Sequence, residues 1–110
     1  MWEKLQLYTQ LHDFYHPLLT DKQNTCFTMH YLEDMSLSEV GEVLGITPQA
    51  VADQVKRTTN VLLKYEDKLG LVQAWQIRQE QIKAIEVELN NICKNENTIT
   101  KIKGILSDLS

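Results

Sequence analysis

The sequence predicts an all-α fold, and two observations carry this prediction. Apolar residues recur at three- and four-residue steps over most of the chain, which is the spacing of one helix face. No segment shows the alternation of apolar and polar residues that is typical of a half-buried β-strand. With 110 residues, of which 43% are hydrophobic and 24% charged, the chain is long enough for a modest core. We expect a helix-turn-helix domain over residues 1–70 and a helical extension over residues 71–110.

Two helices are predicted ahead of the helix-turn-helix. An apolar face describes a first helix over about residues 3–16, which Pro17 ends or bends because proline interrupts the backbone hydrogen bonds. Thr20 and Gln23 have the spacing of a capping box, in which each side chain bonds to the other residue's backbone N–H. The second helix should therefore begin after Thr20 and continue to about Leu32.

The first helix of the motif is predicted to begin after Ser36. Ser36 and Glu39 repeat the capping-box spacing, and Gly45 should end the helix because glycine adopts a positive φ at little cost. Gly41 supplies the small residue that the helix crossing requires, four residues before the turn.

The second helix of the motif is predicted from Pro48 to Leu69. Thr47 is its expected N-cap, and Pro48 occupies the first position, where a missing N–H costs nothing. Gly70 is the expected stop. An inward stripe is predicted along this helix, formed by Val51, Val55, Leu62 and Leu69. The apolar bracket of the motif consists of Val40, Leu44, Ile46, Val51 and Val55.

A fifth helix over about residues 71–92 has a different, seven-residue spacing. Trp75, Ile82 and Leu89 are seven apart, and Arg78, Ile85 and Ile92 lie at the intervening positions. This pattern indicates a helix–helix seam, either with the preceding long helix as an αα-hairpin or with a second copy of the chain. We expect a homodimer, because the chain has more apolar stripes than one small core hides.

The segment CKNENT interrupts this pattern, and a short amphipathic helix should follow, capped by Asn97 or Thr98. The sequence leaves open whether residues 91–110 are docked.

Four stretches resemble the YlxM family of small cytosolic proteins from Gram-positive bacteria. They are LHDFYHPLLTDKQ, YLEDMSLSEVGEVLGI, QAVADQVKRT and YEDKLGL, which together span about residues 5–72. The resemblance implies a fold like the promoter-binding C-terminal region of sigma factors, without a wing. It also implies a link to the signal recognition particle, as an accessory or regulatory protein. The chain departs from the family pattern at Pro48, where a basic residue is frequent, and at Ala52, where an aromatic residue is frequent.

The candidate nucleic-acid contacts lie on the second helix of the motif, whose N-terminal residues face base edges in docked proteins of this kind. Phosphate contacts are expected from Lys56, Arg57 and Lys64, and contacts at the helix tip from Thr47 and Gln49. The ligand would be promoter DNA or the particle's RNA. The net charge of −4, with no basic third of the chain, confines any such surface to a local patch.

The alternative is a protein-interaction module that binds no nucleic acid. It would engage the particle's GTPase through exposed apolar and acidic surface. The salt dependence of binding separates the two hypotheses, because phosphate contacts weaken steeply as salt rises.

Sequence patterns for catalysis, metals and cofactors are not found. The segment HDFYH imitates the HExxH zinc motif, but Asp13 is shorter than the required glutamate and Pro17 ends the helix beside His16. We therefore interpret His12 and His16 as residues of an amphipathic helix. Cys26 and Cys93 are far apart in the sequence and are expected to be unpaired thiols in a cytoplasmic protein without a membrane span.

Overall fold

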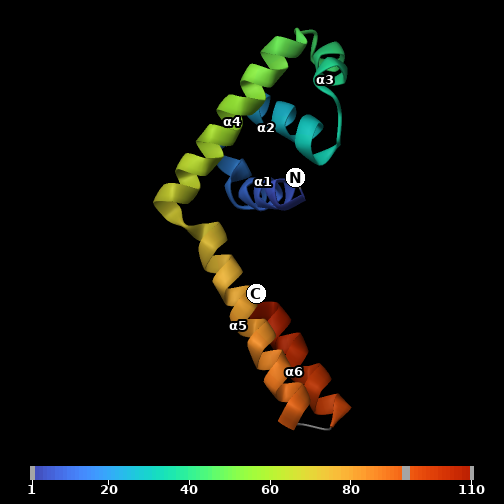
Figure 1. The fold of residues 1–110 in the computed structure, drawn as a ribbon, viewed down its shortest axis with the longest axis vertical. Coiled ribbons are helices and arrows are strands. Elements are labelled where there is room, and N and C mark those ends of the chain that lie inside the picture. The colour runs from blue at the N-terminus through green and yellow to red at the C-terminus, as the bar shows by residue number, and fades with distance from the viewer. Residues whose placement is uncertain (1, 93–94, 110) are drawn as a thin grey trace. The chain divides into compact units, whose positions relative to one another are not determined.

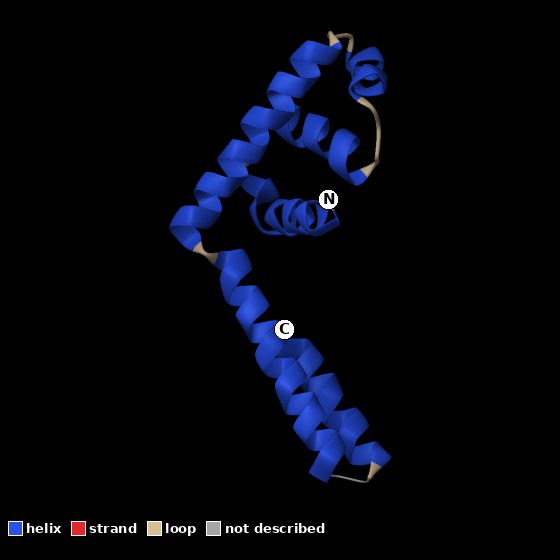
Figure 2. Cartoon of the chain, in the orientation of Figure 1, coloured by secondary structure: helices blue, strands red, loops and turns tan. Residues whose placement is uncertain are grey.

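The protein is all-α, as predicted. The computed structural model describes residues 2–92 and 95–109, and none of these residues forms a strand. The α-helices are α1 (Trp2–Tyr15), α2 (Asp21–Phe27), α3 (Leu37–Leu44), α4 (Pro48–Leu69), α5 (Leu71–Ile92) and α6 (Glu96–Leu109) (Figures 1 and 2). The chain divides into two compact units after Gly70. Within the described residues, every helix falls short of the length and apolarity needed to cross a bilayer.

The predicted caps are present at the helix starts. At α2 the Thr20 hydroxyl accepts a hydrogen bond from the Gln23 backbone N–H, and the Gln23 side chain accepts one from Thr20. The same reciprocal pair joins Ser36 and Glu39 at α3. These bonds satisfy backbone donors that have no partner inside the helix, which fixes where each helix begins.

The two predicted glycine stops are confirmed. Gly45 has φ +72° at the end of α3, and Gly70 has φ +61° at the end of α4. Both values lie in the left-handed region that side chains with a β-carbon avoid.

The second helix does reach Leu32, but its last part is wider than expected. Residues Thr28–Leu32 form a π-helix, and the Glu33 backbone N–H donates to the Thr28 carbonyl. A pattern read at 3.6 residues per turn does not distinguish this wider turn from an ordinary one. A short 3₁₀-helix, His16–Leu18, follows α1, so Pro17 ends the first helix as expected.

The core of the first unit is formed where α2, α3 and α4 meet. Cys26, Val40, Val51 and Val55 form one buried cluster. Each fully buried aliphatic side chain of this size contributes about 1.5–3 kcal/mol to folding. Partly buried side chains surround the cluster: Met29, Tyr31, Met35, Leu37, Leu44 and Ile46.

One residue of the predicted α4 stripe is exposed. Val51, Val55 and Leu62 are buried, whereas Leu69 is 55% exposed at the last residue of the helix. The spacing identifies a helix face but not how far its neighbours cover it.

In the second unit α5 and α6 lie side by side (Figure 1). Trp75, Ile82 and Leu89 are partly buried, whereas Arg78, Ile85 and Ile92 are exposed. Three of the six predicted seam residues are therefore partly covered within the chain, where α5 packs against α6. The sequence had suggested the preceding long helix or a second copy as the partner, and not α6. The expected cap of α6 was wrong, because the Asn95 side chain accepts from the backbone N–H groups of Asn97 and Thr98.

Candidate nucleic-acid interface

The helix-turn-helix depends on a close approach at Gly41. A β-carbon at this position would lie 2.6 Å from the Ile46 carbonyl oxygen, which is too close for any side chain. The same turn is closed by a hydrogen bond from the Ile46 backbone N–H to the Gly41 carbonyl at 3.0 Å. This contact sets α3 against the start of α4 and so fixes which face of α4 is exposed.

The N-terminus of α4 is capped by Thr47, which the sequence nominated for a contact at the helix tip. The Thr47 hydroxyl accepts a hydrogen bond from the Ala50 backbone N–H at 3.1 Å. Its oxygen is thus engaged in holding the helix, while the residue itself is exposed. A phosphate at this end would meet the remaining backbone N–H groups and the positive end of the helix dipole.

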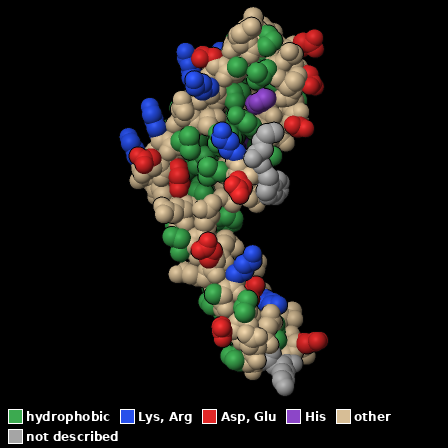
Figure 3. All heavy atoms as spheres, viewed as in Figure 1, with side chains coloured by type: hydrophobic (Ala, Val, Ile, Leu, Met, Phe, Trp, Pro, Cys, Tyr) green, Lys and Arg blue, Asp and Glu red, His purple; other side chains and the backbone are tan. Residues whose placement is uncertain are grey.

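One face of α4 combines the other four nominated residues. A helix advances by about 100° per residue, which places Gln49, Lys56, Arg57 and Lys64 opposite the buried stripe. All four are exposed. Lys and Arg side chains gather along α4 in this view (Figure 3). The structure therefore brings these side chains to one side of the helix.

The nominated residues cover a longer stretch of α4 than a single groove contact would use. Gln49 and Lys64 are separated by about 22 Å along the axis, at about 1.5 Å per residue. Gln49 suits the tip of a helix that enters a groove, whereas Lys64 suits a backbone contact where the helix leaves it. Asn60 is exposed midway between Lys56 and Lys64 and was not among the nominated residues. The four-residue spacing of these three positions was the available signal.

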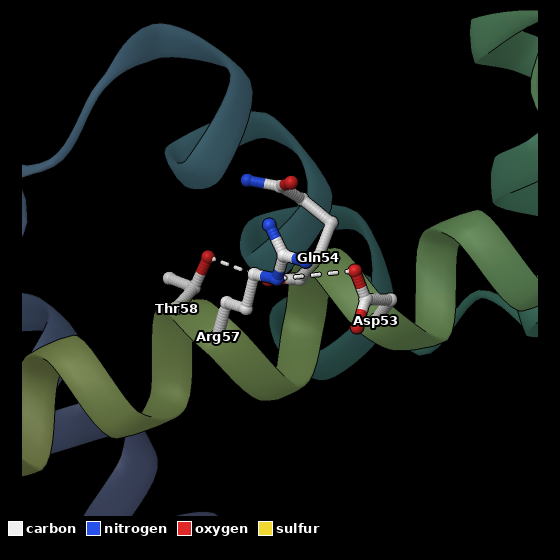
Figure 4. A network of polar contacts seen from close by, with 4 residues as sticks. All are labelled: Asp53, Gln54, Arg57 and Thr58. Atoms are coloured by element: carbon white, nitrogen blue, oxygen red, sulfur yellow. Dashed lines mark hydrogen bonds and ion pairs between the residues drawn. The ribbon is translucent and has the colours of Figure 1, made fainter.

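An acidic residue lies among the candidate cations. Arg57 Nε and Asp53 Oδ2 are 3.1 Å apart, one helical turn from each other (Figure 4). Their side chains are 72% and 60% exposed, so the pair contributes little to stability. The negative charge of Asp53 nevertheless lowers the net positive charge of this face of α4. Beside it, the buried Thr58 hydroxyl donates to the Gln54 carbonyl at 2.8 Å, so this side chain bonds within the helix.

Of the two histidines of HDFYH, His12 takes part in packing between α1 and α2, whereas His16 is exposed and contacts His12. His12 Nε2 is 2.6 Å from Asn24 Oδ1, and its ring stacks on Phe27 with centroids 5.6 Å apart. His16 Nδ1 donates to the His12 carbonyl at 2.9 Å. Within the described residues, no three histidine, cysteine, aspartate or glutamate side chains are grouped to hold a metal ion.

Cys26 is an unpaired, fully buried thiol. Burial raises its pKa, an effect that the positive charge of Lys22 partly opposes. This thiol is therefore a core residue rather than a reactive one. Cys93 lies outside the described residues.

The sequence matches a family of known proteins over nearly its whole length. Residues 2–105 match the family UPF0122, described as "Putative helix-turn-helix protein, YlxM / p13 like". UPF0122 proteins from Listeria welshimeri and Listeria monocytogenes are each 37% identical over 111 residues, covering 96% of this chain and 99% of theirs. A UPF0122 protein from Bacillus thuringiensis is 45% identical over 82 residues, covering 74% of both chains.

Proposed function

We propose, on the premise that this chain belongs to the UPF0122 family of YlxM/p13-like helix-turn-helix proteins, that its exposed α4 face binds nucleic acid. The observation that carries the proposal is the placement of Lys56, Arg57 and Lys64 on one exposed side of the motif's second helix. The role is that of a non-enzymatic regulatory or accessory protein in the cytoplasm. The family resemblance favours a link to the signal recognition particle, so promoter DNA and the particle's RNA are the two ligands to compare.

The charge of this face limits the affinity of one copy. Residues 48–64 contain three basic residues and one acidic residue, and Asp53 pairs with one of the three. Because most duplex affinity comes from neutralised phosphates, a single copy should bind weakly and with a shallow salt dependence.

A homodimer would double the number of phosphate contacts. The second unit supports this part of the proposal, because Ile77, Ile85, Val87 and Ile92 of α5 remain exposed. Sedimentation equilibrium should then return twice the 12.8 kDa mass of the chain. A single-chain mass at micromolar concentration would remove the dimer from the proposal without touching the α4 face.

The residue assignment is tested by removing charge from α4 and, for comparison, from the second unit. Lys56→Ala with Arg57→Ala should lower the slope of log Kd against log salt by about 1–2. The control is Lys83→Ala with Lys101→Ala, which makes the same charge change at exposed positions outside the motif. Equal losses in the two variants would contradict the assignment, since they would report only net charge.

A variant that gains affinity sharpens this test. Asp53→Asn releases Arg57 and removes a charge that repels phosphate, so binding should become roughly twofold to fivefold tighter. Asp108→Asn, at an exposed position in α6, is the matched control and should change binding little. If Asp53→Asn leaves the affinity unchanged, this face of α4 is not where the phosphates lie.

A further inference from the structure

A hollow of about 610 Å³ opens on the first unit, and none of the five nominated residues lines it. It lies between α1, the π-helix and the segment that leads into α3. Its walls include Leu5, Tyr8, Tyr31 and Met35. This volume is within the range of about 300–1,000 Å³ that is typical of ligand sites.

The aromatic wall of the hollow is held in place by its neighbours. The Tyr8 and Tyr31 rings meet edge to face with centroids 5.0 Å apart, and the rings of His30 and Tyr31 are 4.8 Å apart. His30 Nδ1 donates to the Met35 carbonyl at 2.9 Å. On its other side Tyr31 lines a smaller hollow together with Thr59 of α4. The rings therefore present an ordered surface to an occupant.

The rim of the hollow is acidic. Asp34 and Glu39 line it, against the single cation Lys4. Neither rim carboxylate forms an ion pair within 4.0 Å with a described Lys, Arg or His side chain. One Glu39 oxygen accepts from the Ser36 backbone N–H at 3.2 Å, which leaves its second oxygen available to an occupant. Acidic side chains gather on the α3 side of this unit (Figure 3).

We infer that this hollow binds an arginine- or lysine-bearing segment of a partner protein. A guanidinium group stacks on tyrosine rings and donates hydrogen bonds to carboxylates, so the walls and the rim favour the same occupant. Two carboxylates against one ammonium would repel a phosphate. A purely apolar helix end would desolvate the rim carboxylates without compensation. Arginine satisfies both features better than lysine, because its planar fork also pairs with carboxylates in two places.

This site is separate from the proposed nucleic-acid face. None of the residues that line the hollow is Thr47, Gln49, Lys56, Arg57 or Lys64. A smaller hollow of about 330 Å³ shares Tyr8, His30 and Tyr31 and extends to Lys56 and Asn60 on α4. A long occupant would approach the nucleic-acid face from that side, so the test uses a probe of one residue.

The test is an NMR titration of the intact chain with N-acetyl-arginine amide. Saturable amide shifts are expected at Tyr31, Asp34 and Ser36. The matched neutral probe is N-acetyl-citrulline amide, which keeps the shape of the side chain without its charge and should bind at least about tenfold more weakly. No saturable shift with the arginine probe up to roughly 10 mM, or equal binding of both probes, would overturn the inference.

The rim charges are tested by the double variant Asp34→Asn with Glu39→Gln. Asparagine tolerates the positive φ of +56° at position 34, and glutamine at position 39 preserves the capping box, so the fold should be unchanged. Loss of both charges should weaken the arginine probe by about tenfold. The control, Asp13→Asn with Asp67→Asn, makes the same charge change at exposed positions outside the hollow and should bind as the unmodified chain does. Equal weakening in both variants would contradict the rim assignment, whatever the nucleic-acid measurements show.

Discussion

Gly41 and Gly104 both lie inside helices, yet an added methyl group would meet different surroundings at the two positions. At Gly41 a β-carbon would lie 2.6 Å from a backbone carbonyl oxygen, whereas at Gly104 nothing lies within 4 Å. A backbone atom is held by its own hydrogen bonds and does not move aside as the end of a side chain does. The crossing of α3 and α4 is thus determined at a single residue.

This contrast predicts opposite effects of the same substitution. Gly41→Ala should lower the free energy of unfolding by about 1–2 kcal/mol, because the clash outweighs the better helix propensity of alanine. Gly104→Ala should raise the stability of α6 by about 0.5–1 kcal/mol, since only the propensity changes. Urea denaturation followed by circular dichroism measures both. A Gly41→Ala variant as stable as the unmodified chain would contradict the crossing geometry.

At the scale of single elements, the sequence predicted the features that depend on neighbouring residues, namely the starts and ends of helices. The capping boxes at Thr20 and Ser36 and the stop at Gly45 each depend on residues within four positions of one another, so their spacing was sufficient. The cap of α6 was misassigned, because Asn95, Asn97 and Thr98 all suit that role and spacing does not choose among them. The π-helix was missed because it depends on how the turn packs.

The cap of α4 provides a prediction at this scale. Thr47→Ala should destabilise the first unit by about 1 kcal/mol, because the Ala50 backbone N–H loses its acceptor. Thr47→Ser keeps the hydroxyl and should retain most of the stability. Thr100→Ala is the control, because that hydroxyl donates to a carbonyl inside α6 and caps nothing. If Thr47→Ala melts at the same temperature as the unmodified chain, this hydroxyl has no capping role.

At the scale of the whole molecule, the sequence predicted the fold class better than the surfaces. Periodicity identified the helices, but it did not show that α5 packs beside α6 or that Leu69 is exposed. Both depend on which elements meet, and one sequence contains that information only indirectly. The aromatic hollow was missed for the same reason, because Tyr8 and Tyr31 belong to different helical segments and meet only in the folded unit.

Net charge is also a property of the whole molecule, and here it does not reveal that positive and negative side chains lie on different parts of the surface. The chain carries −4 overall, while cations gather along α4 and acids on the α3 side of the same unit. A surface with this separation suits two ligands of opposite charge better than its net charge suggests. The nucleic-acid proposal therefore depends on the local face of α4 and not on the total.

The most direct test of the central claim is the fluorescence anisotropy of labelled nucleic acid with the intact protein at two salt concentrations. The two ligands are duplex DNA from upstream of the protein's own gene and the small RNA of the signal recognition particle. We expect binding to at least one of them, weakened by about tenfold or more between roughly 50 and 200 mM salt. No binding to either ligand at the lower salt, or an affinity that does not change with salt, would contradict it.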